Sequence, residues 1–122
     1  MIVDDYQLVA PRHSNPPIHQ LLPWLRTDSL ERGLHFVIAR QAEGLMTAQN
    51  SDPLLRQLNA DRAPAVLLSA DKFEGGVGEV KFERFGIPGR GRYVETTFGR
   101  TERIQAAWSN IRDNDTTEFE ND

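Results

Sequence analysis

The sequence has 122 residues, of which 39% are hydrophobic and 26% charged, with a net charge of −4. This length is enough for one domain with a buried core and too short for two ordinary ones. No apolar run approaches the roughly 20 residues that a membrane span needs, and the acidic N-terminus predicts no secretory signal. Because the chain has no cysteine, disulfides, thiolate nucleophiles and Cys-ligated zinc sites are excluded.

The acidic residues are concentrated at the C-terminus. Residues 113–122 hold five acids and no base, so 18 − 5 leaves 13 acids against 14 bases in residues 1–112, a net charge of +1. A segment with one apolar residue in ten cannot bury enough surface to fold. We therefore predict one folded domain over residues 1–112 and a disordered acidic tail over residues 113–122. The near-neutral body does not indicate direct binding of nucleic acid.

The first nine residues read as a short buried strand that ends in two adjacent acids, Asp4 and Asp5. In α/β folds a strand of this kind delivers its last side chains to the carboxyl edge of the sheet, where ligands bind. In a regular strand the two side chains would point to opposite faces. They therefore suit one magnesium ligand with one neighbouring group better than a paired acid and base.

The chain up to residue 69 alternates between helix and strand signals. Apolar residues at helical spacing predict an amphipathic helix over about residues 18–32, with Pro23 as an interruption. Ser51 or Asp52, followed by Pro53, is typical of a helix start. The predicted order after the first strand is a loop over 10–17, the helix over 18–32, a strand over 34–40, a short helix within 41–50, a helix from 53 and a strand over 64–69.

From residue 70 to residue 91 six glycines interrupt the chain and leave room only for short strands, such as one over 80–85. Residues 92–96 and 102–108 then predict two antiparallel strands around a turn. The order is βαβαβ followed by a hairpin region. This order predicts a three-layer α/β sheet with an antiparallel extension.

Five segments of the sequence carry a resemblance to a known family: Asp4–Tyr6, Gly33–Arg40, Ala65–Ser69, Pro88–Val94 and Ile104–Trp108. They come in the order seen in FtsK/SpoIIIE-type ATPases, and the chain resembles in particular the last ATPase domain of EccC, the motor component of type VII (ESX) secretion systems. The resemblance covers about residues 1–108. It implies a RecA-like P-loop NTPase fold, Mg-ATP as cofactor of the full domain, a hexamer-forming motor and recognition of exported ESX-type substrates. It also implies a cytoplasmic location, with contact to the membrane only through the secretion complex.

The resemblance assigns roles to three residues. Asp4 matches the Walker B aspartate, which holds Mg²⁺ directly or through water. Asp5 matches the position where active enzymes of this type have the glutamate that polarises the attacking water. Aspartate is one methylene shorter, so its carboxylate is set back by about 1.5 Å, and attack geometry is sensitive at that scale. Arg40, at the end of its strand, matches a polar residue that senses the γ-phosphate; a solvated arginine is the alternative.

The sequence departs from the family at the phosphate-binding loop. A Walker A loop needs Gly-x4-Gly-Lys-Ser/Thr, because its backbone N–H groups and its lysine hold the phosphates, and no glycine of the chain begins such a pattern. In the family the Walker A strand lies between the strands that match residues 34–40 and 64–69. We therefore predict a partial RecA-like sheet that lacks this strand and that does not bind ATP tightly alone.

Three interpretations remain at this point. The chain is the C-terminal part of an ESX-type ATPase domain, truncated or split, whose partners are the remaining part of the domain and other motor subunits, with substrate docking as a further role. Alternatively it is an independent non-enzymatic interaction domain or a decayed remnant, with another chain in the gap. The third interpretation is an unrelated small hydrolase that uses Asp4 or Asp5. His13, His19 and His35 have no metal-ligand spacing.

Overall fold

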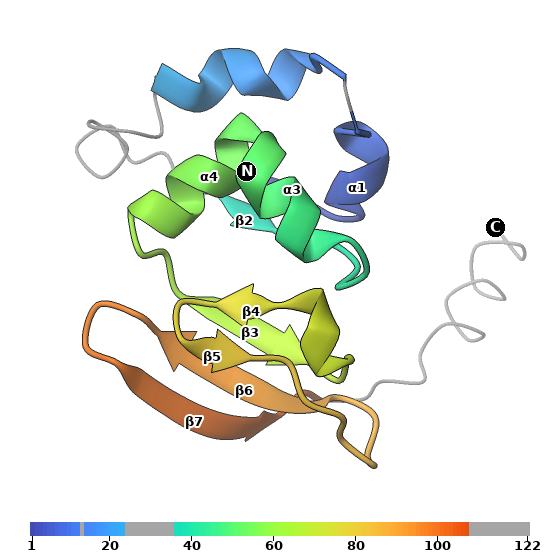
Figure 1. The fold of residues 1–122 in the computed structure, drawn as a ribbon, viewed down its shortest axis with the longest axis vertical. Helices are drawn as coiled ribbons and strands as arrows, with labels where there is room; N and C mark the ends of the chain where they lie inside the picture. The colour runs from blue at the N-terminus through green and yellow to red at the C-terminus, as the bar shows by residue number, and fades with distance from the viewer. Residues whose placement is uncertain (13, 24–35, 108–122) are drawn as a thin grey trace, which may run out of the picture.

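The computed structural model describes residues 1–12, 14–23 and 36–107 (Figure 1). Most of the helix predicted over 18–32, the start of the strand predicted over 34–40 and the tail over 113–122 lie outside these ranges. In chain order the elements are β1 (Ile2–Val3), α1 (Tyr6–Val9), η1 (Pro17–Leu21), β2 (Val37–Ile38), α3 (Leu45–Ser51), α4 (Pro53–Ala60), β3 (Ala65–Leu68), η2 (Lys72–Glu74), β4 (Gly76–Val77), β5 (Val80–Lys81), β6 (Arg90–Glu95) and β7 (Arg100–Gln105).

The N-terminal strand is shorter than the sequence predicted. β1 stops at Val3, Asp5 has a backbone φ of 48° and ψ of 48°, and α1 begins at Tyr6. A left-handed residue ends an extended strand, and aspartate is one of the few non-glycine residues that adopt this conformation readily. The expectation that Asp4 and Asp5 lie in a regular strand with opposite orientations is therefore wrong. Both residues lie in the turn between β1 and α1.

The strands of the described residues form three separate sheets. β1 and β2 pair in parallel, with Ile2 opposite Val37 and Val3 opposite Ile38. β3, β6 and β7 form an antiparallel sheet in that order, and β4 and β5 form a short antiparallel pair. β2 is connected to β3 through α3 and α4, yet β2 and β3 are not hydrogen-bonded to each other in the part of the chain that the structure describes.

The C-terminal hairpin begins and ends slightly earlier than the sequence pattern indicated. The strands expected over 92–96 and 102–108 are found at Arg90–Glu95 and Arg100–Gln105, in a continuous register from Arg90 opposite Gln105 to Glu95 opposite Arg100. The strand expected over 80–85 is reduced to β5, because it pairs with only two residues of β4. The mixed α/β class is as predicted.

One apolar core connects the helices with the sheets. Asp52 starts α4, because its Oδ1 accepts hydrogen bonds from the N–H groups of Leu54 (2.9 Å) and Leu55 (3.1 Å). The cap fixes α4 with these two leucines in the core. Figure 1 shows α3 and α4 next to each other in front of β2. The buried residues are Tyr6, Leu45, Leu54, Leu55, Leu67, Ala70, Phe82 and Val94, and Val3 and Ile38 pack against them.

Gly91 allows the close approach of β3 and β6. A Cβ added at Gly91 would lie 2.5 Å from the backbone oxygen of Leu67, the residue beside its partner Leu68 in the register. No side chain fits at that distance without displacement of one strand. Gly91, the second glycine of the Pro-Gly-Arg-Gly segment, therefore has a packing role in the sheet.

Candidate functional site

All three sequence-predicted site residues lie at one edge of the β1–β2 sheet. Because the two strands are parallel, their carboxyl ends meet at the same edge. Asp4 and Asp5 follow β1, and Arg40 lies two residues after the end of β2. The Tyr6 N–H donates to the Ala39 carbonyl at 2.9 Å, which joins the turn after β1 to the segment after β2.

The aspartate turn presents exposed carboxylates. Asp4 and Asp5 are both exposed, and the Asp5 N–H donates to Asp4 Oδ1 at 2.9 Å. Among the described residues no group of three or more His, Cys, Asp and Glu side chains could hold a metal ion. Mg²⁺ is commonly bound through one or two carboxylates together with substrate phosphates and water. The donor chemistry of the turn therefore fits a magnesium ion that phosphates also hold, and does not form an all-protein metal cage.

Within the described residues, Arg40 donates its hydrogen bonds to main-chain carbonyls and not to the aspartates. Its Nε donates to the Gln41 carbonyl and its Nη2 to the Glu43 carbonyl, each at 2.9 Å. Burial lowers the pKa of the Arg40 guanidinium, and the charge of Asp52 and then that of Tyr6 act in the opposite direction. The described residues contain no hydrogen bond or ion pair between Arg40 and either aspartate. The structure thus brings Asp4 and Asp5 together and places Arg40 at the same edge without contact.

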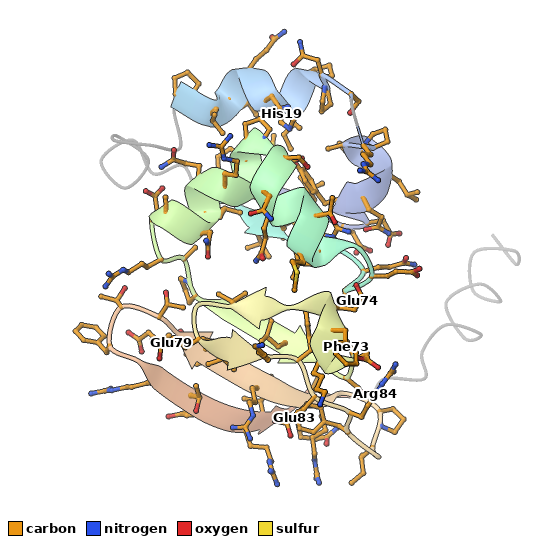
Figure 2. All side chains as sticks on the ribbon, in the orientation of Figure 1. His19, Phe73, Glu74, Glu79, Glu83 and Arg84 are labelled. Carbon is orange, nitrogen blue, oxygen red and sulfur yellow. The ribbon has the colours of Figure 1, made fainter. Side chains whose placement is uncertain are left out.

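The residue after the aspartates belongs to a partly buried polar cluster. Tyr6 is fully buried, and its hydroxyl donates to the Asp52 carboxylate at 3.0 Å and 2.9 Å from Oδ1 and Oδ2. His19 Nε2 lies 3.1 Å from the Tyr6 hydroxyl and 3.4 Å from Asp52 Oδ2. Figure 2 shows His19 between η1 and the helices beneath it. The cluster therefore connects α1, η1 and the start of α4.

The environment keeps the Tyr6 hydroxyl protonated. Burial raises the pKa of Tyr6, and the hydrogen bond to Asp52 and the charge of that carboxylate raise it further. A protonated phenol is a hydrogen-bond donor, which the acceptor-only carboxylate of Asp52 requires. The Tyr6 side chain therefore acts as a fixed positioning group beside the aspartate turn.

Known proteins resemble the chain in sequence and in structure. No protein-family model matches it. It is 37% identical over 82 residues to the ESX-5 secretion system protein EccC5 of Mycobacterium marinum, and 36% identical over 109 residues to the ESX-4 secretion system protein EccC4 of Mycobacterium tuberculosis. These matches cover 66% and 89% of the chain. The chain spans only 6% and 8% of the length of these two relatives.

Two solved structures of Thermomonospora curvata EccC superimpose on 89% of the chain. One contains ATPases 2 and 3 in complex with a signal sequence peptide, with a TM-score of 0.77. The other is the cytoplasmic domain of this type VII secretion ATPase, with a TM-score of 0.76. Both are 34% identical to the chain, which covers 19% and 12% of them. The chain is related to the ATPase domains of EccC. The resemblance stated from the sequence motifs is confirmed.

The polar cluster of this EccC-like chain was missed by sequence reasoning. Tyr6 and His19 are 13 positions apart and Tyr6 and Asp52 are 46 apart, so no local spacing joins them. The one available signal was the Asp-Pro pair at the start of α4, which predicted a cap and gave no indication of a second partner for Asp52. The spacing of His19 from the other histidines indicates no metal site, and it gives no sign of the contact with Tyr6.

A pocket of about 350 Å³ opens beside the cluster in the EccC-like chain. Its polar lining combines Arg40 and Asp52 with side chains of the loop before η1 and of α3. Asp4 and Asp5 are not part of the lining. The pocket and the aspartate turn are therefore separate features, although Arg40 lines the pocket and lies at the same sheet edge as the turn. The polar residues of the lining include Arg12, Ser14, His19, Arg40, Thr47 and Asp52.

Among the described residues, no helix is long and apolar enough to cross a membrane.

Proposed function

We propose that this chain supplies the Walker B part of an ATPase domain in a type VII (ESX) secretion motor. The observation that supports it best is the exposed Asp4–Asp5 turn at the carboxyl edge of two paired parallel strands in an EccC-like chain. This is the edge at which α/β folds bind their ligands. The partners would be the remaining part of the ATPase domain and other subunits of the motor, at the cytoplasmic face of the membrane.

The three site residues would act around Mg-ATP, which supplies the phosphoryl group and its counter-ion when bound. Asp4 would hold the magnesium ion with its carboxylate, whose Oδ1 also accepts the Asp5 N–H. Asp5 would orient the attacking water from a shorter side chain than glutamate. Arg40 fixes the segment after β2 through its two carbonyl contacts, and its remaining N–H groups are the donors that could sense the γ-phosphate.

The response of the isolated chain to Mg-ATP tests the proposal that it holds only part of the ATP site. No described glycine turn carries the lysine and hydroxyl of a phosphate-binding loop, so Mg-ATP should leave its melting temperature unchanged. The measurement is a thermal melt at millimolar ATP with and without Mg²⁺. A magnesium-dependent rise of several degrees that disappears in Asp4→Ala would contradict the proposal that the chain holds only part of the site.

Docking of an exported substrate is a second candidate function. It is favoured by the solved EccC structure in complex with a signal sequence peptide and by a pocket of about 540 Å³ on the chain. The pocket lies among the α4–β3 loop, the β4–β5 turn and the β6–β7 turn. Its apolar walls are Val77, Val80 and Val94, which suits the apolar side chains of a peptide.

A blocking substitution tests the docking role. Thr101 is exposed and lines the pocket, whereas Arg103 is exposed on the same strand and does not. We expect Thr101→Trp to weaken binding of a labelled ESX signal-sequence peptide at least tenfold and Arg103→Trp to leave it unchanged, as measured by fluorescence anisotropy. Equal effects of the two substitutions on peptide binding would contradict a docking role for this pocket.

A further inference from the structure

The pocket of about 350 Å³ beside the polar cluster has few unused hydrogen-bond acceptors. Asp52 Oδ1 accepts from the first N–H groups of α4, and both Asp52 oxygens accept from the Tyr6 hydroxyl. Gln7 Oε1 accepts from the Gln41 N–H at 3.2 Å. Among the described residues of the lining, Asp52 and Gln7 alone carry a carboxylate or an amide side chain, so these acceptors are already engaged.

The same pocket has unused donors and a net positive charge. Within the described residues, neither the Arg12 guanidinium nor the Thr47 hydroxyl has a hydrogen bond or an ion pair. Arg40 uses Nε and Nη2 on main-chain carbonyls, so Nη1 remains. With His19 neutral, the lining holds two arginines against the single carboxylate of Asp52, whose side chain is only 11% exposed. A cationic lining rich in donors suits a carboxylate, which only accepts hydrogen bonds.

The main-chain N–H groups at the two helix starts beside the pocket are already hydrogen-bonded. The Gly44 N–H, at the start of α3, donates to Glu74 Oε2 at 2.8 Å. The first N–H groups of α4 donate to Asp52. Phosphate sites usually depend on such N–H groups, whereas the donors that remain here belong to side chains. The pocket therefore suits the carboxylate of a peptide side chain better than a phosphate group.

The chain itself contains a segment of this chemistry, because residues 113–122 hold five acids and no base. β3 and β7 both run antiparallel to β6, so they end at the same end of the sheet, with Leu68 opposite Gly91 and Gly91 opposite Ile104. η2 follows β3 there and accepts the hydrogen bond from Gly44, a residue of the pocket lining. The chain therefore leaves β7 at the end of the sheet that is joined to the pocket.

The connection from β7 is long enough to reach the pocket. Ala107 is the last described residue before the acidic segment, and Glu118 follows it by 11 positions, a reach of at most about 40 Å. A domain of about 100 residues has a radius of gyration of only about 13 Å. A segment on a short flexible connection has an effective concentration in the millimolar range, so contacts of one or two carboxylates are sufficient.

We propose that this pocket binds the acidic segment 113–122 of the same chain, with carboxylates of the segment on the guanidinium groups of Arg12 and Arg40. The occupied pocket would cover the Tyr6–Asp52 contact from the side of the loop before η1. The contact requires neither Mg²⁺ nor nucleotide, so it goes beyond the proposed ATPase role and can fail or hold independently of it.

A single spin label in the full chain tests the contact by NMR. The chain has no cysteine, so Thr117→Cys carries the only nitroxide and removes no acid. We expect paramagnetic broadening of the Thr47 amide signal, at the pocket, to be at least fivefold stronger than that of Gly99, in the β6–β7 turn. The difference should decrease in 1 M salt, because the Debye length falls from about 10 Å to about 3 Å. Equal broadening of the two signals at low salt would overturn the proposal.

Charge substitutions provide the matched control. Arg12→Glu changes an exposed residue of the lining and should remove the preferential broadening at Thr47. Arg103→Glu changes the net charge equally, at an exposed position on β7 outside the lining, and should leave it intact. Replacement of all five acids of 113–122 by their amides changes no residue of the folded domain and should also remove it. Equal effects of the two arginine substitutions, or broadening that persists without the acids, would overturn the proposal.

Isotope mixing shows which chain supplies the segment. In a mixture of isotope-labelled chain without nitroxide and unlabelled chain with nitroxide, broadening can arise only between molecules. We expect the Thr47 signal to be unaffected in this mixture. Broadening as strong as in the doubly labelled chain would place the segment of a second copy in the pocket and overturn the assignment to the same chain.

Discussion

Tyr6 donates a hydrogen bond from its buried hydroxyl to both carboxylate oxygens of Asp52, at 3.0 Å and 2.9 Å, across 46 positions of sequence. Tyr6 directly follows the Asp4–Asp5 turn, and Asp52 is the cap of α4. The contact therefore fixes the start of α1 against the start of α4. It makes the position of the candidate magnesium ligand dependent on a residue far away in the chain.

Removal of the Tyr6 hydroxyl should destabilise the fold. Tyr6→Phe keeps the ring and loses a hydrogen bond to a charged group, which is worth about 1.5–3 kcal/mol. Asp52→Asn is the companion variant, because asparagine is an equally good cap but loses the charge and has an NH2 donor in place of one acceptor oxygen. Urea unfolding of the full chain measures both. A Tyr6→Phe variant within about 0.5 kcal/mol of the wild type would show that the contact contributes little.

The raised pKa of Tyr6 predicts a loss of stability in alkali. Burial, followed by the hydrogen bond and charge of Asp52, raises the pKa above the ordinary value of about 10. The unfolded chain therefore releases this proton first, and the free energy of unfolding falls as the pH rises through the interval between the two values. The contribution of the Tyr6 hydroxyl to the free energy of unfolding is fully present below about pH 10.

A single-tyrosine variant isolates this effect. The chain has two tyrosines, so Tyr93→Phe leaves only Tyr6. We expect its free energy of unfolding to fall by up to about 1.4 kcal/mol per pH unit above pH 10, and the fall to be smaller in Tyr6→Phe. Urea unfolding at a series of pH values, with phenolate absorbance as the second signal, gives the comparison. Identical slopes in the two variants would contradict the assignment to Tyr6.

Two glycines of the same segment should differ in their response to substitution. A Cβ at Gly91 meets the Leu67 carbonyl oxygen at 2.5 Å, whereas a Cβ at Gly86 has nothing within 4 Å. We expect Gly91→Ala to cost about 1–3 kcal/mol of stability, as overpacking does, and Gly86→Ala to be nearly neutral. Chemical denaturation decides the point, and comparable losses in both variants would contradict the role of Gly91 in the approach of β3 to β6.

The length of the Asp5 side chain should limit hydrolysis in a joined domain, in which the segment of Mycobacterium tuberculosis EccC4 that precedes the region matched to this chain is fused ahead of the full chain. Asp5→Glu extends the carboxylate by about 1.5 Å, and we expect at least a tenfold faster turnover. Its backbone φ of 48° suits glutamate less well than aspartate, so a stability loss of about 0.5–1 kcal/mol should accompany the gain. Asp5→Asn retains the turn and should abolish turnover. Phosphate release assays measure all three, and slower turnover in Asp5→Glu would exclude the water-orienting role.

Much of the fold was predictable because its signals are local. The Asp52–Pro53 helix start and the aliphatic run of β3 were predicted near their observed positions. The end of β1 was not, because Asp5 takes a left-handed conformation next to a long-range hydrogen bond, from the Tyr6 N–H to the Ala39 carbonyl in the segment after β2. Pattern reasoning cannot detect a contact that forms only after β1 and β2 have paired.

The sequence indicated which residues belong to the candidate site, but not the contacts that those residues make. Asp4 and Asp5 were singled out by their place after an apolar run, and Arg40 by the resemblance to the ATPase family; their roles stay predictions. That Arg40 uses its donors on the Gln41 and Glu43 carbonyls has no sequence signal, because the main chain of any residue offers a carbonyl. Tyr6 shows the same limit, since its acceptor lies on another helix.

The central claim is that Asp4 is the magnesium ligand of an ATP site which this chain only partly encodes. Calorimetric titration of Mg-ATP into the joined domain tests it most directly, with Asp4→Asn as the matched variant and the chain alone as the reference. The account predicts magnesium-dependent binding to the joined domain, a loss of at least tenfold in affinity in Asp4→Asn, and no measurable heat with the chain alone. Binding of equal affinity in the Asp4→Asn domain, or no binding to a folded joined domain, would contradict it.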